Sequence, residues 1–277
     1  WSELLEDLVA TGMETGHKAI VSRGSEITMQ NKTKEREFFD KRTELGEYEV
    51  LTQYGYNKII SDFRRLIGSR LSKGCRVIDL GCGTGSFTRR IFQNSEAELF
   101  GLDISKKSIQ LASQYEGKIN YLVGDIEDLQ FEDGFFDLVV YSGILHHFPN
   151  EEKCLAEGYR VLKKGGCVIS CDPNKMNPFM WLYRDPSSPF SSKVGKTDNE
   201  RLLSTQGVSR VMKNIGFTRV DAHCISGITF KTVDSQVGNI FLPFYNTVER
   251  FMGVLPLANK FGSILICYGE KSDSLHC

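Results

Sequence analysis

The segment that most constrains this chain runs from residue 76 to residue 87. Its letters, RVIDLGCGTGSF, describe an apolar, β-branched strand that leads into a glycine-rich turn and then into a helix. Gly81, Gly83 and Gly85 lack the Cβ atoms that would keep a ligand away from the main chain, and they can adopt positive φ. The first turn of the helix presents free N–H groups above the glycines. The segment therefore predicts a strand–turn–helix unit that binds a ligand.

Acidic residues stand at the ends of the first two expected strands. Asp79 lies near the end of the strand before the turn, and Asp103 ends the next strand, residues 98–103. A carboxylate at this second position suits a ribose diol, because it can accept hydrogen bonds from both hydroxyls. A nicotinamide- or flavin-binding unit is the competing interpretation. Its G-x-G-x-x-G spacing differs from the G-x-G-x-G spacing found here.

Together these residues resemble motif I and the following acidic motif of the class I S-adenosylmethionine-dependent methyltransferases. Three later segments also resemble that family: Gly124-Asp125-Ile126, residues 136–147 and residues 162–166. The resemblance covers residues 76–172, in the expected order. It implies an α/β fold with a Rossmann-like, doubly wound, mostly parallel sheet of seven strands, to which N-terminal helices and cap insertions are added.

The same resemblance implies S-adenosylmethionine as cofactor and S-adenosylhomocysteine as product. Ligands of such sheets bind beyond the carboxyl ends of the strands. Cys82 is expected to contribute main-chain contacts rather than thiol chemistry. The residues implied in cofactor binding are Asp79, Gly81, Cys82, Gly83, Gly85, Asp103, Ile104, Asp125, Ile126 and Ser142.

The chain is expected to hold a single methyltransferase domain at residues 29–277. Residues 1–28 are interpreted as a tag, a linker or an upstream remnant, because the chain begins with Trp1 and Met29 could be a native start. Within the domain we expect N-terminal helices at 29–75, the cofactor-binding core at 76–172, and cap insertions at 173–200 and 227–261.

Apolar spacing predicts the secondary structure of the domain. In the core, strands are expected at 76–80, 98–103, 119–123, 135–141 and 166–172, alternating with helices at 86–93, 105–115 and 151–161. Outside the core we expect helices at 35–42, 55–71 and 177–184, a sixth strand at 218–225 and a seventh at 262–268. Alternation at this pitch is typical of a parallel sheet covered by helices on both faces.

Methyl transfer needs an acceptor lone pair in line with the methyl carbon, and a base when the acceptor carries a proton. His146 and His147 are the candidate catalytic bases, because imidazole accepts a proton near neutral pH. A structural role in the loop is the alternative for either one. No metal is expected, since adjacent side chains should diverge and no further ligands with suitable spacing are evident.

Three residues are candidate acceptor contacts: Tyr48, Asp172 and Arg184. Tyr48 belongs to a cluster of tyrosines, for which ordinary packing is the alternative. Asp172 could orient the acceptor or cap the segment that follows it. Arg184 could bind a carboxylate or phosphate of the acceptor, or pair with a neighbour such as Asp185.

The predicted function is transfer of a methyl group to an oxygen or nitrogen atom of a small-molecule acceptor. The large apolar groups of residues 240–257 suggest that this acceptor could be apolar. Three alternatives remain open: a cofactor-binding module without turnover, a protein methyltransferase, and another transfer chemistry such as aminopropyl transfer.

Composition limits the partners. A net charge of −1 gives no reason to expect nucleic acid, and no apolar run is long enough to span a bilayer. Basic residues near 240–257 are too few to favour binding to a membrane surface. The eight cysteines form no C-x-x-C pair, and no secretory pattern is evident, so we expect free thiols and a cytoplasmic location. Composition gives no indication of the oligomeric state.

Overall fold

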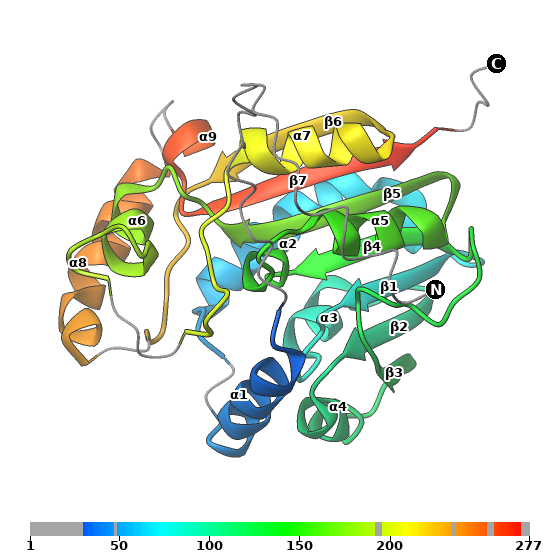
Figure 1. The fold of residues 1–277 in the computed structure, drawn as a ribbon, viewed down its shortest axis with the longest axis horizontal. Helices are drawn as coiled ribbons and strands as arrows, with labels where there is room; N and C mark the ends of the chain where they lie inside the picture. Colours follow the sequence, from blue (N-terminus) through cyan, green and yellow to red (C-terminus); the bar gives the residue numbers. More distant parts are fainter. Residues whose placement is uncertain (1–29, 47–48, 192–195, 234–235, 254–257, 273–277) are drawn as a thin grey trace, which may run out of the picture.

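The fold is that of a computed structural model, which describes residues 30–46, 49–191, 196–233, 236–253 and 258–272. Their strands form one seven-stranded sheet in the order β3-β2-β1-β4-β5-β7-β6 (Figure 1). Strand β7 pairs antiparallel with both β5 and β6, and the other pairings within this sheet are parallel. The strands are β1 Arg76–Leu80, β2 Glu98–Asp103, β3 Ile119–Val123, β4 Phe136–Ser142, β5 Leu162–Pro173, β6 Phe217–Ile225 and β7 Ile264–Lys271.

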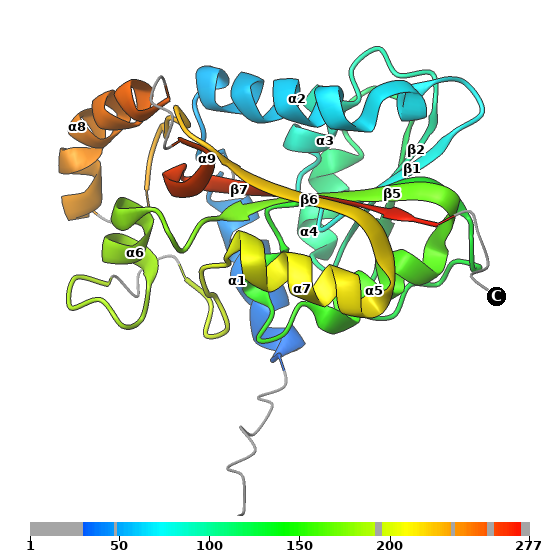
Figure 2. The same ribbon diagram turned by 90° about the horizontal axis from the view of Figure 1, so that it is seen from above.

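Helices cover both faces of the sheet. Helices α2 and α3 lie on one face, and α5 and α7 lie on the other (Figure 2). This arrangement confirms the predicted Rossmann-like, doubly wound sheet. The helices are α1 Lys32–Glu44, α2 Gln53–Ile67, α3 Ser86–Ile91, α4 Lys106–Ala112, α5 Glu152–Val161, α6 Pro178–Arg184, α7 Thr205–Ile215, α8 Gln236–Met252 and α9 Ala258–Phe261, with short 3₁₀ turns η1 Gly68–Leu71 and η2 Leu145–His147.

Strand β4 explains why the core strands are apolar without alternation. Val139 and Tyr141 pack with the α5 and α7 side of the core, whereas Leu138 and Val140 pack with the α2 side. All four side chains are fully buried. A strand covered on both faces has no polar side, so a continuous apolar run is the pattern that fits it.

Parallel pairing sets the carboxyl ends of the first four strands at one edge. The last residue of β1, Leu80, is in register with Leu102 near the end of β2 and with Tyr141 near the end of β4. Asp103, the last residue of β2, is in register with Val123, the last residue of β3. The loops that follow these strands therefore meet, and any site that they build lies at this edge.

Helices α8 and α9 were absent from the predicted elements, which gave 227–261 only as a cap insertion, and so was helix α7. Its apolar residues Val208, Val211, Met212 and Ile215 have helical spacing and pack in the core, so the sequence did carry a signal for it. Other elements differ at their ends: β5 begins four residues earlier than expected, at Leu162, because that residue pairs with β4.

The two cap segments come together at one end of the molecule. Helix α6 follows β5, α8 follows β6, and both views show them side by side beyond the end of the sheet (Figures 1 and 2). The rings of Phe179 and Tyr245 meet between them, with centroids 5.5 Å apart. None of the described helices is both long and apolar enough to cross a membrane.

Replacing Gly158 by alanine should destabilise the protein, although alanine is normally the better helix former. A Cβ at Gly158, inside α5, would lie 2.3 Å from the hydroxyl oxygen of buried Tyr141, which donates to the Cys154 carbonyl. We expect a loss of about 1–3 kcal/mol in urea unfolding. Gly117→Ala, whose Cβ would have nothing within 4 Å, should leave stability nearly unchanged. A gain of stability in Gly158→Ala would contradict this packing.

Candidate functional site

A cavity of about 350 Å³ opens at the carboxyl edge of the sheet. The loops after β1, β2, β3 and β4 line it together with the end of β5. Helices α1 and α2 close it from the N-terminal side. The cavity is therefore lined by the loops at the carboxyl ends of the core strands and by the two helices that precede the core in the chain.

The glycine turn after β1 is held tightly against the end of β2. The N–H groups of Gly81 and Cys82 both donate to the Leu102 carbonyl, at 2.7 and 3.1 Å. Gly81 has φ +76°, and a Cβ there would lie 2.5 Å from Ile144. Gly83 also has positive φ, but a Cβ there would meet nothing within 4 Å. The turn is thus packed on one side and open above Gly83, where a ligand can approach the main chain.

Asp103 connects this turn to the next one. Its carboxylate accepts from the N–H of Gly83 and from the N–H of Ser105, each at 2.8 Å. Burial raises the pKa of Asp103, and these main-chain donors act in the opposite direction. The side chain lines the cavity, so remaining lone pairs can accept from a diol.

Asp79 lies behind the turn and is not among the residues that line the cavity. Its two oxygens accept from the hydroxyls of Thr88, at 2.6 Å, and Ser142, at 2.7 Å. Burial is the main cause that raises its pKa to about 7. Asp79 therefore ties the helix after the turn to the end of β4.

Helix α1 covers the cavity through polar contacts. Lys32 pairs with Asp125 and Glu127 in the loop after β3. Asp40 accepts from the Ser105 hydroxyl at 2.6 Å. These contacts bring the N-terminal helix onto the part of the cavity that Asp103 and Asp125 line.

His146 and Asp172 form a buried pair on the other side of the cavity. His146 Nδ1 lies 2.9 Å from Asp172 Oδ1, which also accepts from the His146 N–H at 3.1 Å. Burial lowers the pKa of His146, with the charges of Arg184 and Arg201 acting in the same direction. The imidazole is therefore neutral at neutral pH, and Nε2 is its nitrogen that remains for a ligand.

His147 stands beside this pair with a different set of neighbours. Its Nδ1 lies 3.3 Å from the Thr197 hydroxyl and 3.9 Å from Glu35 Oε2. Its ring packs edge-on against Phe39. Glu35 Oε2 is buried without a hydrogen bond, and burial raises the pKa of this carboxyl. Glu35 was not a predicted site residue, because it stands in a mostly charged helix whose sequence does not mark it.

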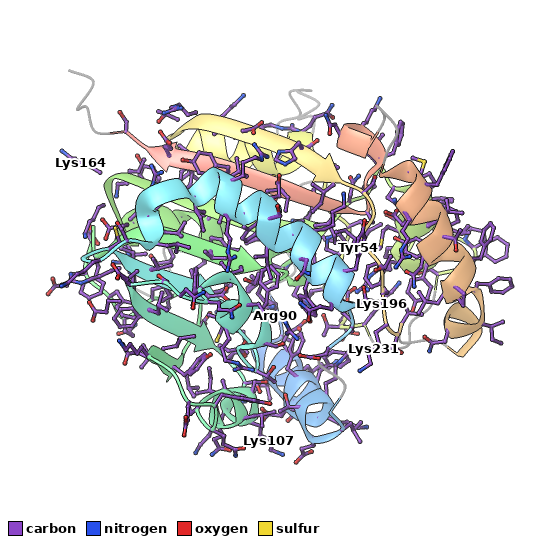
Figure 3. The ribbon with its side chains drawn as sticks, turned by 180° about the vertical axis from the view of Figure 1, so that it is seen from behind. Tyr54, Arg90, Lys107, Lys164, Lys196 and Lys231 are labelled. Atoms are coloured by element: carbon purple, nitrogen blue, oxygen red, sulfur yellow. The ribbon has the colours of Figure 1, made fainter. Side chains whose placement is uncertain are left out.

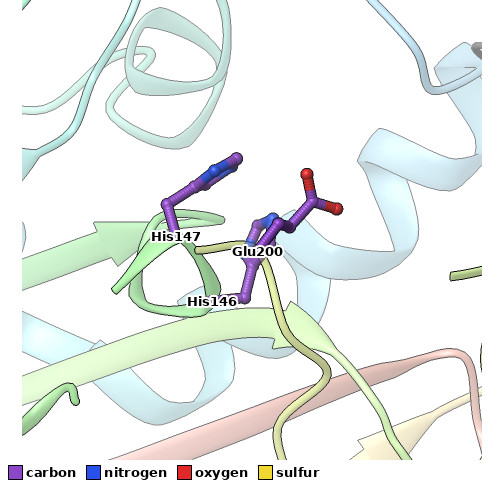
Figure 4. A group of neighbouring side chains, drawn as sticks. All are labelled: His146, His147 and Glu200. Carbon is purple, nitrogen blue, oxygen red and sulfur yellow. The ribbon is translucent and has the colours of Figure 1, made fainter. Parts of the chain in front are cut away.

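The two imidazoles do not diverge as the sequence suggested. Their ring centroids are 4.2 Å apart, and a carboxylate oxygen of Glu200 lies within 4.8 Å of their nitrogens (Figure 4). This set of donors could ligate a metal ion. However, Arg184 pairs with Glu200, so a fixed positive charge already neutralises the carboxylate. The absence of a resident metal stays a prediction, now supported by the Arg184 charge.

The structure brings most of the predicted site residues together. Those that line the cavity are Gly81, Cys82, Gly83, Asp103, Ile104, Asp125, Ile126, Ser142, His146, His147, Asp172 and Arg184. Asp79 and Gly85 stand outside the lining. Arg184 pairs with Glu200, not with its neighbour Asp185. Tyr48 and residues 1–28 lie outside the described residues.

A sequence model described as a methyltransferase domain matches residues 71–218, more than half of the chain. The chain belongs to this family. It is therefore an S-adenosylmethionine-dependent methyltransferase, and the open face of the turn at Gly83 with the carboxylate of Asp103 fits that cofactor.

Curated relatives of this methyltransferase act on different atoms. An uncharacterized methyltransferase of Synechocystis is 32% identical over 60% of this chain and 77% of that protein. An O-methyltransferase of Penicillium expansum is 27% identical over 64% of this chain and 65% of that protein. The ubiquinone/menaquinone biosynthesis C-methyltransferase of Pasteurella multocida is 27% identical over 65% and 77%. The chain spans less than two thirds of the O-methyltransferase.

Solved structures share the fold of this methyltransferase at low identity. A possible histamine N-methyltransferase of Thermotoga maritima has TM-score 0.61 and 17% identity, over 85% of this chain and 99% of that one. The [4+2]-cyclase SpnF has TM-score 0.61 and 14% identity, over 91% and 100%. Likeness at this level concerns the fold alone, and the cyclase shows that one fold accommodates different reactions.

Asp103→Ala should weaken binding of S-adenosylmethionine and S-adenosylhomocysteine by about tenfold to a hundredfold, because a charge-assisted acceptor is lost. Isothermal calorimetry measures this directly. The matched control is Asp128→Ala, an exposed carboxylate after the next strand that is not among the cavity-lining residues. Unchanged affinity in a folded Asp103→Ala protein would remove this residue from the cofactor site.

Asp79→Asn should change how stability depends on pH. Native Asp79 has its pKa raised to about 7, so the folded protein binds a proton that the unfolded chain releases near pH 4. Stability of the wild type should therefore fall relative to Asp79→Asn as pH rises from about 4 to about 7, by about 4 kcal/mol in total. Urea unfolding across this range measures the difference.

The control for this pH series is Glu132→Gln, which removes an exposed carboxylate. Its unfolding free energy should follow the wild type at each pH. If the difference in unfolding free energy between wild type and Asp79→Asn stayed constant across this pH range, burial would not shift the pKa of Asp79.

Proposed function

We propose that this methyltransferase methylates a hydroxyl oxygen of a small, largely apolar acceptor, and that His146 removes the hydroxyl proton. The observation that carries this proposal is the buried pair of His146 and Asp172 at the cavity. Asp172 occupies Nδ1 of the ring and leaves Nε2 as the nitrogen that can accept a proton. A protonated nitrogen acceptor would need the same base, and so would a phenol methylated on its ring.

The reaction needs little beyond positioning and proton removal. S-adenosylmethionine, when bound, supplies a methyl group on a sulfonium, whose leaving thioether needs no acid. His146 starts neutral, because burial lowers its pKa, and becomes an imidazolium when it takes the acceptor proton. Asp172 holds the ring through Nδ1. Burial raises the pKa of this carboxyl, and the imidazolium that develops beside it favours its ionised form, which in turn stabilises the positive charge. Asp172 is thus a positioning residue, in contrast to the acceptor contact that the sequence suggested.

The walls near the histidines favour an apolar acceptor. Phe38, Phe39, Phe230 and Ile264 line the same cavity, and Phe39 packs against the His147 ring. Such surfaces suit an aromatic or lipid-like group. Two curated relatives of the chain are O-methyltransferases, one of Penicillium expansum and one of Aspergillus nomiae. This agrees with an oxygen acceptor.

A panel of acceptors tests the activity. Phenols, hydroquinones, aliphatic alcohols and primary amines are incubated with the protein and S-adenosylmethionine, and mass spectrometry detects S-adenosylhomocysteine and the methylated product. We expect turnover with phenolic compounds and a methoxy product. Cofactor binding without product from any acceptor would favour a binding module, and a product methylated at carbon or nitrogen would overturn the oxygen assignment.

His146→Gln should lower kcat by about a hundredfold or more on a phenolic acceptor, with little change in cofactor affinity, because the base is lost. In the wild type, kcat should be constant from about pH 6.5 upward and fall only in acid. The sign follows from the lowered pKa of His146, since the base must be neutral to act. Initial rates at saturating substrate measure both effects.

His147→Gln is the matched control, since its Nδ1 lies 3.3 Å from the Thr197 hydroxyl and 3.9 Å from the Glu35 carboxylate, a longer separation than the 2.9 Å between His146 and Asp172. It should keep kcat within about tenfold of wild type. Asp172→Asn should behave like a milder His146→Gln. Equal losses in both histidine variants, or none in His146→Gln, would refute the assignment of His146 as the base.

A further inference from the structure

Helix α8 exposes several large apolar side chains to solvent. Four large side chains on it are mostly exposed: Ile240 (75%), Phe241 (64%), Phe244 (64%) and Phe251 (66%). Its buried side carries Glu249, which is 1% exposed. The same inward side also buries Leu242, and Tyr245 packs against Phe179 and Phe230, so the helix is apolar on both sides. A helix on a globular domain normally keeps its outer side polar, so the four exposed apolar side chains mark a contact surface.

Hydrogen bonds fix this orientation. Glu249 accepts from the Asn177 side chain and the Gly227 N–H, each at 3.0 Å, and from the Ser263 hydroxyl at 3.2 Å. The Asn246 side chain bonds both the N–H and the carbonyl of Phe230, at 2.9 Å each. Turning the exposed phenylalanines inward would break these buried and half-buried hydrogen bonds. The phenylalanine rings therefore stay in water unless a partner covers them.

Helix α6 and the loop after it extend the apolar surface. Trp181 and Leu182 are 37% and 39% exposed, and Phe190 is 73% exposed. Helices α6 and α8 lie side by side at this end of the molecule (Figure 2), and Figure 3 shows side chains of α8 standing out from its edge. We call the exposed apolar residues of α6, α8 and Phe190 the cap surface.

Among the residues described around the cap surface, the exposed charges are all positive. Exposed cations there are Lys175, Lys231, Arg250 and Lys260. In the described residues of this end (174–191, 226–233, 236–253 and 258–263), the two acidic residues, Asp185 and Glu249, are buried. The net charge of the whole chain is −1, so the cap end is positive while the remainder is not. The sequence suggested too few basic residues because it considered only the neighbourhood of residues 240–257. Lys231 and Lys260 flank that segment within the same insertion, and Lys175 comes from the other insertion.

We propose that the cap surface docks on an anionic lipid bilayer. Exposed aromatic residues can enter the acyl boundary, while the surrounding cations meet negative headgroups. Charge complementarity distinguishes this occupant from a second copy of the chain. A symmetric contact through the same surface would place the same cations against one another, and the described residues of this end offer no exposed acid to offset them.

Docking would also place the cavity beside the bilayer. Phe230, held by Asn246 of α8, lines the cavity, and so does Arg184 at the end of α6. An apolar acceptor dissolved in the membrane could therefore reach the cavity through the docked end. The docking itself needs no methyl transfer, and its test is independent of the proposed function.

Vesicle flotation tests the docking with the full chain. The probes are vesicles of phosphatidylcholine mixed with phosphatidylglycerol, and vesicles of phosphatidylcholine alone. We expect the protein to float with the anionic vesicles, far less with the neutral ones, and less at high salt. Phe241→Ser combined with Phe244→Ser should lower the partition coefficient by at least about tenfold. Lys231→Gln combined with Lys260→Gln should weaken binding to anionic vesicles specifically.

The control is Leu45→Ser combined with Val123→Ser, which removes exposed apolar groups (60% and 54%) outside the cap surface. It should bind like wild type, and thermal melting should show all variants folded. Failure to float with anionic vesicles, or equal flotation of the Phe241/Phe244 variant, would overturn the proposal. So would a wild-type dimer in sedimentation that the same variant converts to monomer, since a second copy would then cover the surface.

Discussion

The site depends on the hydrogen bonds between the turn after β1 and the end of β2. Leu102 accepts from two N–H groups of the turn, and the carboxylate of Asp103 accepts from a third, at Gly83. The turn therefore cannot move without the strand end that carries Asp103. Because β1 is also in register with β4, the loop that bears the histidines is positioned by the same strands. One set of parallel pairings thus places both the cofactor side and the acceptor side of the cavity.

The cavity is unusual in how many carboxyl groups are buried around it. Burial raises the pKa of Asp79, Asp103, Asp172 and Glu35. Burying such groups costs stability unless hydrogen bonds or charges offset it. Hydroxyls and main-chain donors offset part of this cost. A cofactor that carries a sulfonium and an amino group would offset more, so the polar wall and the cationic ligand suit each other.

The cap end and the core differ in where their apolar and polar residues lie. In the core, apolar residues are covered on both faces of the sheet, and polar residues gather at the strand ends. In the cap, buried Glu249 and half-buried Asn246 hold α8 through hydrogen bonds, while Phe241, Phe244 and Phe251 face outward. The core is thus complete as a folded unit, whereas the cap surface has the composition of an interface.

The sequence alone determined the core fold and the cofactor. Apolar runs that end in Gly81 and Asp103 specify strands, turns and strand-end acids, and these depend on neighbours along the chain. The elements whose spacing was read in this way, including α6, formed close to where they were expected. Helix α7 carried the same kind of signal, but that signal was not used in the prediction.

Only the tertiary structure decided which polar residues share the acceptor side. Glu35, His146, Asp172 and Glu200 come from separate segments of the chain, and their pairing depends on how α1 and the post-β5 segment fold over the sheet. The same holds for the outward face of α8, whose apolar residues a sequence assigns to a core. Long-range contacts carry no periodic signal, so the residues that meet across them become known only once the chain is folded.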